Sequence, residues 1–137
     1  MNQSKPKPNG RDPKARHNDA SILGAYGEQA ATRYLEDNGY LIVERNYRAG
    51  KHEIDIIAFK DNELVVVEVK TRSGNDIVEP EEAVNHKKRQ SLIYAANAYV
   101  QQKNRHESVR FDIITVIKKE GTTEIKHIKE AFNVLCF

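Results

Sequence analysis

The chain is poor in cysteine and has no long hydrophobic run. Its single cysteine, Cys136, excludes an intrachain disulfide and a cysteine-rich zinc site. No stretch approaches the roughly 18 consecutive apolar residues of a membrane span, and the N-terminal residues lack the apolar core of a signal peptide. We therefore expect a protein that does not associate with a membrane and that works in the reducing cytoplasm.

Apart from Met1, residues 1–18 contain no large aliphatic side chain. This segment contains three prolines, one glycine and five basic residues against one aspartate. A segment of that composition cannot bury enough apolar surface to fold, so we expect residues 1–18 to form a flexible basic arm. Either the arm attracts a polyanion without sequence specificity, or it only keeps the protein in solution. Residues 19–137 then form a single domain, long enough to bury a core.

The rest of the sequence alternates between helical and strand-like patterns. Apolar residues recur at helical spacing from about Ala20 to Asn38, and Gly39 follows as a stop signal. Pro80, flanked by glutamates that suit the positive end of a helix dipole, predicts the start of a second helix that ends near Asn104. Runs rich in Ile and Val predict strands at 40–47, 52–59, 63–70, 109–117 and 123–128. The order αβββαββ requires a right-handed crossover through the second helix, and it predicts an α/β fold with a mixed central sheet flanked by helices.

Two of these strands form a hairpin that carries the most informative residues. If residues 61–62 form a two-residue turn, antiparallel pairing places Asp55 opposite Glu68 and Glu53 opposite Lys70. Directly opposed Cβ atoms lie about 4.5 to 5.5 Å apart, close enough for two carboxylates to grip one divalent cation. Without a cation, the opposed acids would destabilise the hairpin. The alternative is that these polar residues only form the solvated face of an amphipathic hairpin.

A pair of acids beside a lysine on neighbouring strands suits metal-dependent hydrolysis of a phosphodiester. Two carboxylates can hold Mg²⁺ while leaving several waters in its coordination shell. The ion activates a bound water and neutralises charge that develops in the transition state. Lys70, two residues after Glu68 and on the same face, can hold the attacking water or stabilise the pentavalent phosphate.

These residues resemble a known pattern. Asp55 followed by Glu68-Val69-Lys70 is similar to the PD-(D/E)xK nuclease superfamily, and a longer ordered set resembles the bacterial YraN-like family, which is related to archaeal Holliday junction resolvases. The motifs of that set are Gly24-Ala25-Tyr26-Gly27-Glu28, Tyr34-Leu35, Gly39-Tyr40, Glu53 to Ala58, Val67 to Arg72 and Arg110-Phe111-Asp112. The resemblance covers roughly residues 20–133 and implies a restriction endonuclease-like core.

The resemblance also implies roles for individual residues. Asp55 and Glu68 would be metal ligands for Mg²⁺ or Mn²⁺, with the carbonyl of Val69 as a third ligand. Lys70 would be the catalytic lysine, acting together with the two carboxylates. Glu28, on the first helix, would match the additional acid of resolvase-like proteins, although an acid favoured by the helix dipole explains it equally well.

Further residues flank this set of acids. Glu53 is either an acid outside the immediate metal shell or the partner of Lys70, and His52 stands where the family usually has glycine. Four basic residues are expected either to contact phosphates of a nucleic acid or to form a solvated surface: Arg72, Lys87, Lys88 and Arg89.

Two other patterns have simple structural explanations. Gln90 and Tyr94, four residues apart, resemble the Q-x-x-x-Y element of some related nucleases, although Tyr94 would also serve simply to pack. Arg110 and Asp112 share one face of a strand, which favours a structural salt bridge or a solvent-facing pair.

The sequence therefore predicts a metal-dependent nuclease that acts on DNA or on branched DNA. A junction-resolving enzyme would need two active sites, and hence a homodimer. One alternative is a nucleic-acid-binding or adaptor protein that keeps the fold with little turnover. Another is a protein-interaction module whose acidic face binds a basic partner.

Overall fold

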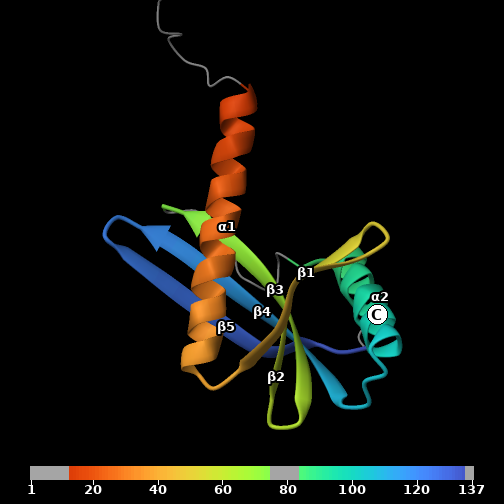
Figure 1. Ribbon diagram of the computed structural model, residues 1–137. Helices are drawn as coiled ribbons and strands as arrows, with labels where there is room; N and C mark the ends of the chain where they lie inside the picture. Colours follow the sequence, from red (N-terminus) through yellow and green to blue (C-terminus); the bar gives the residue numbers. More distant parts are fainter. Residues whose placement is uncertain (1–12, 75–83, 135–137) are drawn as a thin grey trace, which may run out of the picture.

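The computed structural model describes residues 13–74 and 84–134, with side chains from Ala20 onward (Figure 1). The elements are α1 (Pro13–Asp37), β1 (Leu41–Ala49), β2 (His52–Lys60), β3 (Glu63–Ser73), α2 (His86–Gln102), β4 (Ser108–Lys119) and β5 (Thr122–Phe132). The strands lie in the order β1-β2-β3-β4-β5, with β3 and β4 parallel and the other neighbours antiparallel. This mixed five-stranded sheet with two helices confirms the predicted order αβββαββ and is consistent with a restriction endonuclease-like core.

The first helix is longer than the sequence pattern predicts. α1 begins at Pro13 rather than near Ala20. The fixed φ of proline suits the first helical position, and proline loses no hydrogen bond there because a backbone N–H at that position has no partner within the helix. Residues 13–18, which were assigned to the arm, therefore continue the helix, and residues 1–12 lie outside the described residues. Gly39, with a φ of 86°, follows the end of α1 as expected, since a left-handed conformation there suits glycine.

The second helix begins later than predicted. α2 starts at His86, and Asn85 caps it, because its side-chain oxygen accepts a hydrogen bond from the N–H of Lys88 at 2.9 Å. The predicted start at Pro80 was wrong, since Val84 and Asn85 are not helical. Pro80 itself lies outside the described residues.

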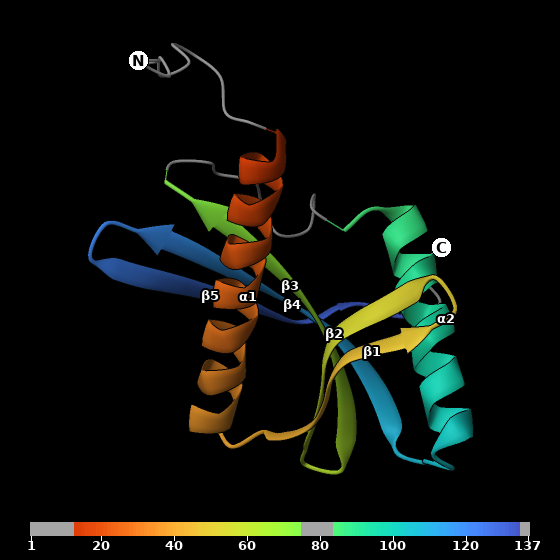
Figure 2. The ribbon, with the colours of Figure 1, turned by 45° about the horizontal axis from the view of Figure 1, so that its top comes forward.

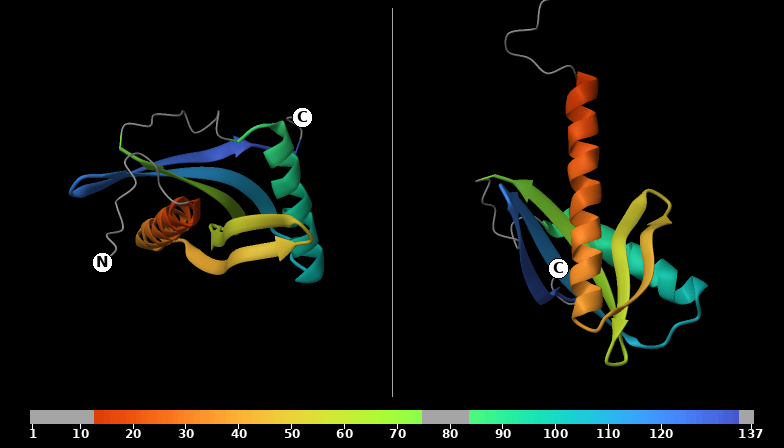
Figure 3. Two further views of the ribbon diagram at one scale, coloured as in Figure 1. Left: turned by 90° about the horizontal axis from the view of Figure 1, so that it is seen from above. Right: turned by 60° about the vertical axis from the view of Figure 1, so that its left-hand side comes forward.

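The two helices cover opposite faces of a twisted sheet (Figure 3). Along β3, Leu64 and Val66 pack in the cluster that contains the buried side chains of α2, whereas Val65 and Val67 pack in the cluster of α1. Both faces of β3 are buried over residues 64–67, and this part of the strand is continuously hydrophobic. Neither of the helices in the described part of the chain is long and apolar enough to cross a membrane.

The β2–β3 hairpin has the predicted register over its first half. Lys60 pairs with Glu63 across the turn, and the ladder runs back to Ile56 opposite Val67. The two turn residues, 61–62, have φ values of 51° and 64°, as a tight hairpin turn with two left-handed residues requires. Beyond Ile56 the two strands separate, and β3 continues beside β4 (Figure 1).

A buried polar network joins α1 to β4 and β5. Asp112, which is 1% exposed, accepts two hydrogen bonds from Arg110 at 2.9 and 2.8 Å and lies 2.7 Å from His127 Nε2. The Tyr34 hydroxyl lies 3.0 Å from His127 Nδ1. Burial by itself would raise the pKa of Asp112, but the hydrogen bonds with His127 and Arg110 bring that pKa below its ordinary value. The predicted salt bridge between Arg110 and Asp112 is therefore confirmed as a structural one.

The packing of α1 on β3 depends on Gly27. A Cβ atom at this position would lie 2.8 Å from the Cβ of Thr71 and still closer to its Oγ1, so rotation of the threonine side chain cannot relieve the clash. At Gly24, one turn earlier on the same helix, an added Cβ would meet nothing within 4 Å. The two glycines therefore form a matched pair for testing this contact.

We expect Gly27→Ala to lower the free energy of unfolding by about 1–3 kcal/mol, because a methyl group forced into a packed contact moves the backbone. Gly24→Ala should instead stabilise the protein by up to about 1 kcal/mol, since alanine favours a helix over glycine. Urea unfolding followed by circular dichroism measures both changes. Equal stability of the two variants would contradict this description of the α1–β3 contact.

Candidate active site

The ladder between β2 and β3 ends at Ile56, directly after Asp55. Figure 2 shows the two strands diverging beyond the ladder. The carboxylate of Asp55 reaches across the gap, because its Oδ2 accepts a hydrogen bond from the N–H of Val69 at 2.8 Å. Core packing also changes here, since Ile54 belongs to the cluster on the α2 face and Ile56 to the cluster on the α1 face. A regular strand would place both on one face. Asp55 is thus held by the backbone of β3 and not by the ladder pairing that the sequence predicts.

Glu68 is a buried carboxylate with two different oxygen environments. The residue is 3% exposed, and its Oε2 lies 3.2 Å from Lys70 Nζ and 3.4 Å from Lys88 Nζ. Its Oε1 is buried without a hydrogen-bond partner among the described residues. Leaving a buried polar atom without a partner is costly, so Oε1 is well suited to accept a cation or a hydrogen-bond donor.

The carboxyl groups of Asp55 and Glu68 are linked electrostatically. Burial is the main cause that raises the pKa of Asp55 to about 8, and the negative charge of Glu68 adds to the rise, while the hydrogen bond from Val69 opposes it. At neutral pH Asp55 therefore carries a proton that a cation must displace. This proton removes the like-charge repulsion that the sequence predicts for the two acids.

α1 brings a third acid, Glu28, toward the same region. Gly27, directly before it, allows the helix to approach Thr71 on the strand that also carries Glu68. Because α1 begins at Pro13, Glu28 lies in the interior of the helix and not in its early turns. The explanation of Glu28 by the helix dipole fails for this reason, since the effect falls off within the first turn.

The surroundings of Glu28 are mixed in charge. Arg45 lies 3.8 Å from its Oε1. Burial raises the pKa of Glu28, Arg45 lowers it in part, and the charges of Glu53 and Glu68 raise it further. Within the described residues, no group of three or more His, Cys, Asp or Glu side chains lies close enough together to hold a metal ion alone. A cation at this site would therefore rest mainly on Asp55 and Glu68.

Glu53 has a different partner from the one that the register suggests. Its Oε2 lies 3.1 Å from a guanidinium nitrogen of Arg48, its neighbour across the β1–β2 ladder. Lys70 pairs with Glu68 instead. The ladder between β2 and β3 ends before it reaches the pair of Glu53 and Lys70, which is why the predicted opposition does not form.

The predicted nucleic-acid contacts fall into two groups. A groove of about 750 Å³ beside Glu68 is lined by Lys51, His52, Lys70, Asn85, Lys87, Lys88, Gln90, Ser91 and Tyr94. Lys87 and Lys88 thus face this groove. Arg89 instead donates to the carbonyl of Val84 at 3.1 Å, and Arg72 donates to the carbonyl of Thr71 at 3.1 Å, so both have structural contacts.

Sequence reasoning missed four members of the site region: Arg45, Lys51, Asn85 and Ser91. Arg45 is recognised only from the contact between β1 and α1. The spacing of Lys87, Ser91 and Tyr94, at intervals of four and three residues, was a usable signal, because side chains so spaced share one face of a helix.

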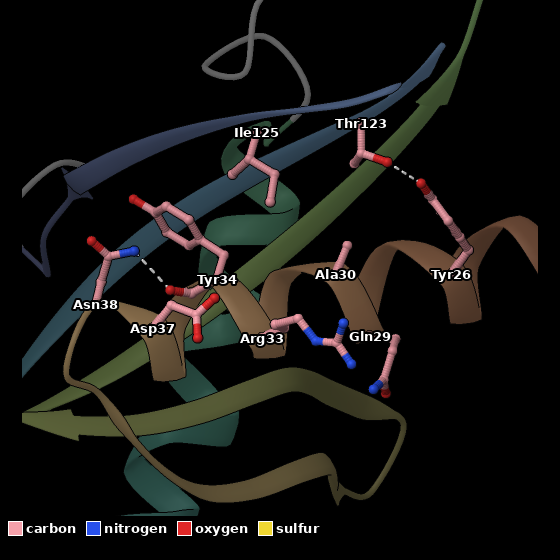
Figure 4. Close-up of a pocket in the computed structure, with 9 residues that line it drawn as sticks. All are labelled: Tyr26, Gln29, Ala30, Arg33, Tyr34, Asp37, Asn38, Thr123 and Ile125. Atoms are coloured by element: carbon pink, nitrogen blue, oxygen red, sulfur yellow. Dashed lines mark hydrogen bonds between the residues drawn. The ribbon is translucent and has the colours of Figure 1, made fainter. Parts of the chain in front are cut away.

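A second groove, of about 560 Å³, lies between α1 and β5 on the other face of the sheet (Figure 4). Thr123 and Ile125 extend from β5 toward α1, and the hydroxyls of Tyr26 and Thr123 are hydrogen bonded. This groove shares no residue with the carboxylates or with the lysines described above, so we do not assign the active site to it.

Comparison with known proteins places this architecture in a family. The model of "Uncharacterised protein family UPF0102" matches residues 27–116, a span that includes Glu28, Asp55, Glu68 and Lys70. The chain belongs to the UPF0102 family. The YraN-like resemblance seen in the sequence is thereby confirmed, and the acids and the lysine described above all lie within the matched part of this UPF0102 chain.

Several UPF0102 proteins are similar to this chain over most of their length. The protein of Bacteroides thetaiotaomicron is 53% identical over 118 residues, which cover 86% of this chain and 95% of the relative. That of Parabacteroides distasonis is 47% identical over 122 residues, covering 89% and 98%. That of Flavobacterium psychrophilum is 45% identical over 118 residues, covering 86% and 97%.

The raised pKa of Asp55 predicts how stability depends on pH and cations. Without a cation, the folded protein binds more protons at Asp55 than the unfolded chain does between about pH 4 and pH 8, so this group makes stability fall as pH rises. Mn²⁺ at roughly millimolar concentration should raise the melting temperature, and more at about pH 8 than at about pH 6, because fewer protons must be displaced.

Thermal unfolding in EDTA and in Mn²⁺ measures this effect. Asp55→Asn should remove the cation-dependent shift and weaken the pH dependence. Asp61→Asn, the same chemical change at the exposed hairpin turn, should leave both intact. A cation shift of equal size in both variants would show that the ion binds elsewhere.

Proposed function

We propose that the protein is a metal-dependent nuclease that hydrolyses phosphodiester bonds in DNA. The main support for this proposal is Glu68, a buried carboxylate with one oxygen unpartnered among the described residues and the other paired to Lys70. Its charge contributes to the raised pKa of Asp55. An acid with a strongly raised pKa, such as Asp55, is typical of catalytic sites.

The residues present fit a hard divalent cation. The oxygens of Asp55 and Glu68 are the kind of ligand that Mg²⁺ and Mn²⁺ prefer, and the unpartnered Oε1 of Glu68 is an acceptor suited to such an ion. The carbonyl of Val69 and the carboxylate of Glu28 are the further ligands that the family resemblance implies. The ion, when bound, would lower the pKa of a coordinated water and offset charge on the phosphate.

The lysines of the site would act on the substrate. Lys70, two residues from Glu68 on the same face of β3, can orient the attacking water or donate to a phosphate oxygen as negative charge builds there. Lys87 and Lys88 line the adjoining groove and would attract the phosphate backbone without sequence preference. A cytoplasmic location would give such an enzyme access to cellular DNA. A junction-resolving activity would in addition require a homodimer.

One observation favours a second candidate, a nucleic-acid-binding protein without turnover. Lys70 and Lys88 both pair with Glu68, which neutralises the buried acid without a cation. In that case the groove would bind phosphates while the carboxylates only keep the lysines in place.

Cleavage assays separate the two candidates. We expect purified protein to cut supercoiled, single-stranded or four-way-junction DNA in Mg²⁺ or Mn²⁺ and to lose activity in EDTA. Asp55→Asn and Lys70→Ala should each lower the rate about 100-fold or more, as removal of a group that stabilises transition-state charge does.

Asp61→Asn and Lys129→Ala, at exposed positions outside the site, serve as matched controls and should retain activity. Cleavage that survives both site substitutions would refute the assigned residues. Tight binding without cleavage under all these conditions would favour the second candidate.

A further inference from the structure

The groove of about 750 Å³ beside Glu68 is called the basic groove, because four lysines line it. One of its walls is aromatic and has no part in the proposed hydrolysis. Tyr94 is 59% exposed, although it is a large and mostly apolar side chain. Its ring lies 4.7 Å from that of His52, with an angle of 49° between the planes. One side of Tyr94 therefore leans on His52, while much of its surface stays open to the groove that both residues line.

The position of this aromatic pair is well defined. The Nδ1 of His52 lies 2.7 Å from the hydroxyl of Ser91, a bond that joins the start of β2 to α2. Tyr94 is three residues further along α2 than Ser91, on the same face of the helix. The hydrogen bond thus holds His52 against α2, and His52 supports one side of the Tyr94 ring, as a stacking surface requires.

The rest of the groove is suited to a polyanion. Within the described part of the chain, the nine residues that line it include four lysines and no carboxylate. Two of these lysines, Lys70 and Lys88, are also the ion-pair partners of Glu68, so the groove opens directly beside the carboxylates. A positively charged groove that contains an exposed aromatic ring is the combination that binds single strands, because phosphates contact the cations and a base stacks on the ring.

We propose that this groove binds an unpaired nucleotide next to the scissile phosphate, with its base stacked on Tyr94 and its flanking phosphates held by the lysines. The substrate class is then a nucleic acid with unpaired bases, either single-stranded or at a branch. In an intact duplex the base faces are covered, so a base must leave the stack before it can lie on the ring. The inference rests on the proposed function only in placing the scissile phosphate beside Glu68 and Lys70.

Binding in EDTA tests the proposal without any need for cleavage. Fluorescence anisotropy would measure the affinity of the full-length protein for a labelled single-stranded DNA, for the same backbone with abasic sites, and for the matching duplex. We expect the intact strand to bind about fivefold or more tightly than the abasic one, the smallest effect that base stacking on an aromatic side chain usually gives.

Substitutions at Tyr94 test whether the preference for the intact strand depends on the tyrosine ring. Tyr94→Ala should bring the affinity for the intact strand down to that for the abasic strand and leave duplex binding unchanged, whereas Tyr94→Phe, which keeps the ring, should retain the preference. Leu41→Ala, at a residue that is 64% exposed on β1 and outside the groove lining, is the control and should behave like the unchanged protein. Circular dichroism verifies that all variants are folded.

The outcomes are distinct. A preference for bases that survives in Tyr94→Ala, or an equal loss of affinity for all three ligands, would overturn the stacking site. If no substrate is cut but the Tyr94-dependent preference is present, the proposed hydrolysis fails while the nucleotide-binding groove stands. An RNA strand of the same sequence reports whether the sugar matters, and binding of RNA with the same dependence on Tyr94 would also support the site.

Discussion

The separation of β2 from β3 at Asp55 is the constraint on which the candidate site depends. Up to Ile56 the two strands share a ladder, and beyond it β3 remains paired only with β4. The gap exposes the edge of β3 to side chains from both helices. Glu28 on α1 is affected by the charge of Glu68, and Lys88 on α2 forms an ion pair with it. Residues from opposite layers can therefore act on one carboxylate.

Burying acids in this gap costs free energy, which a backbone hydrogen bond, protonation and ion pairs offset in part. Asp55 accepts a backbone hydrogen bond and has a raised pKa, so it can be protonated at neutral pH. One oxygen of Glu68 is paired with two lysines. The other oxygen has no partner among the described residues. Buried charges are tolerated only when paired or hydrogen bonded, so the unpartnered oxygen is the point at which a further positive group would lower the free energy.

The two faces of the sheet have different tasks in this arrangement. On the α1 face, the contact of Gly27 with Thr71 and the network around Asp112 fix the helix and the last two strands. On the α2 face, the basic groove begins beside Glu68 and extends to Tyr94. The first face supplies rigidity, and the second supplies the surface that faces a ligand.

The sequence by itself determined the features that depend on neighbouring residues. Turn chemistry at residues 61–62 predicted the hairpin register, and periodicity predicted the order of the elements. The spacing of Asp55, Glu68 and Lys70 predicted that acids and a lysine would gather, because a tight turn fixes which residues of two strands meet. These predictions needed no knowledge of how the layers pack.

The tertiary structure alone decided where the ladder ends, and with it the partners of the charged groups. The twist of the sheet and the packing of a helix on each face set that point, and they depend on residues far apart in the sequence. For the same reason Lys88 pairs with Glu68 and His52 meets Tyr94. The pairing of Glu53 with Arg48, in contrast, follows from the short turn between β1 and β2. Local patterns could name the chemistry of the site, but only the packing of distant elements could arrange it.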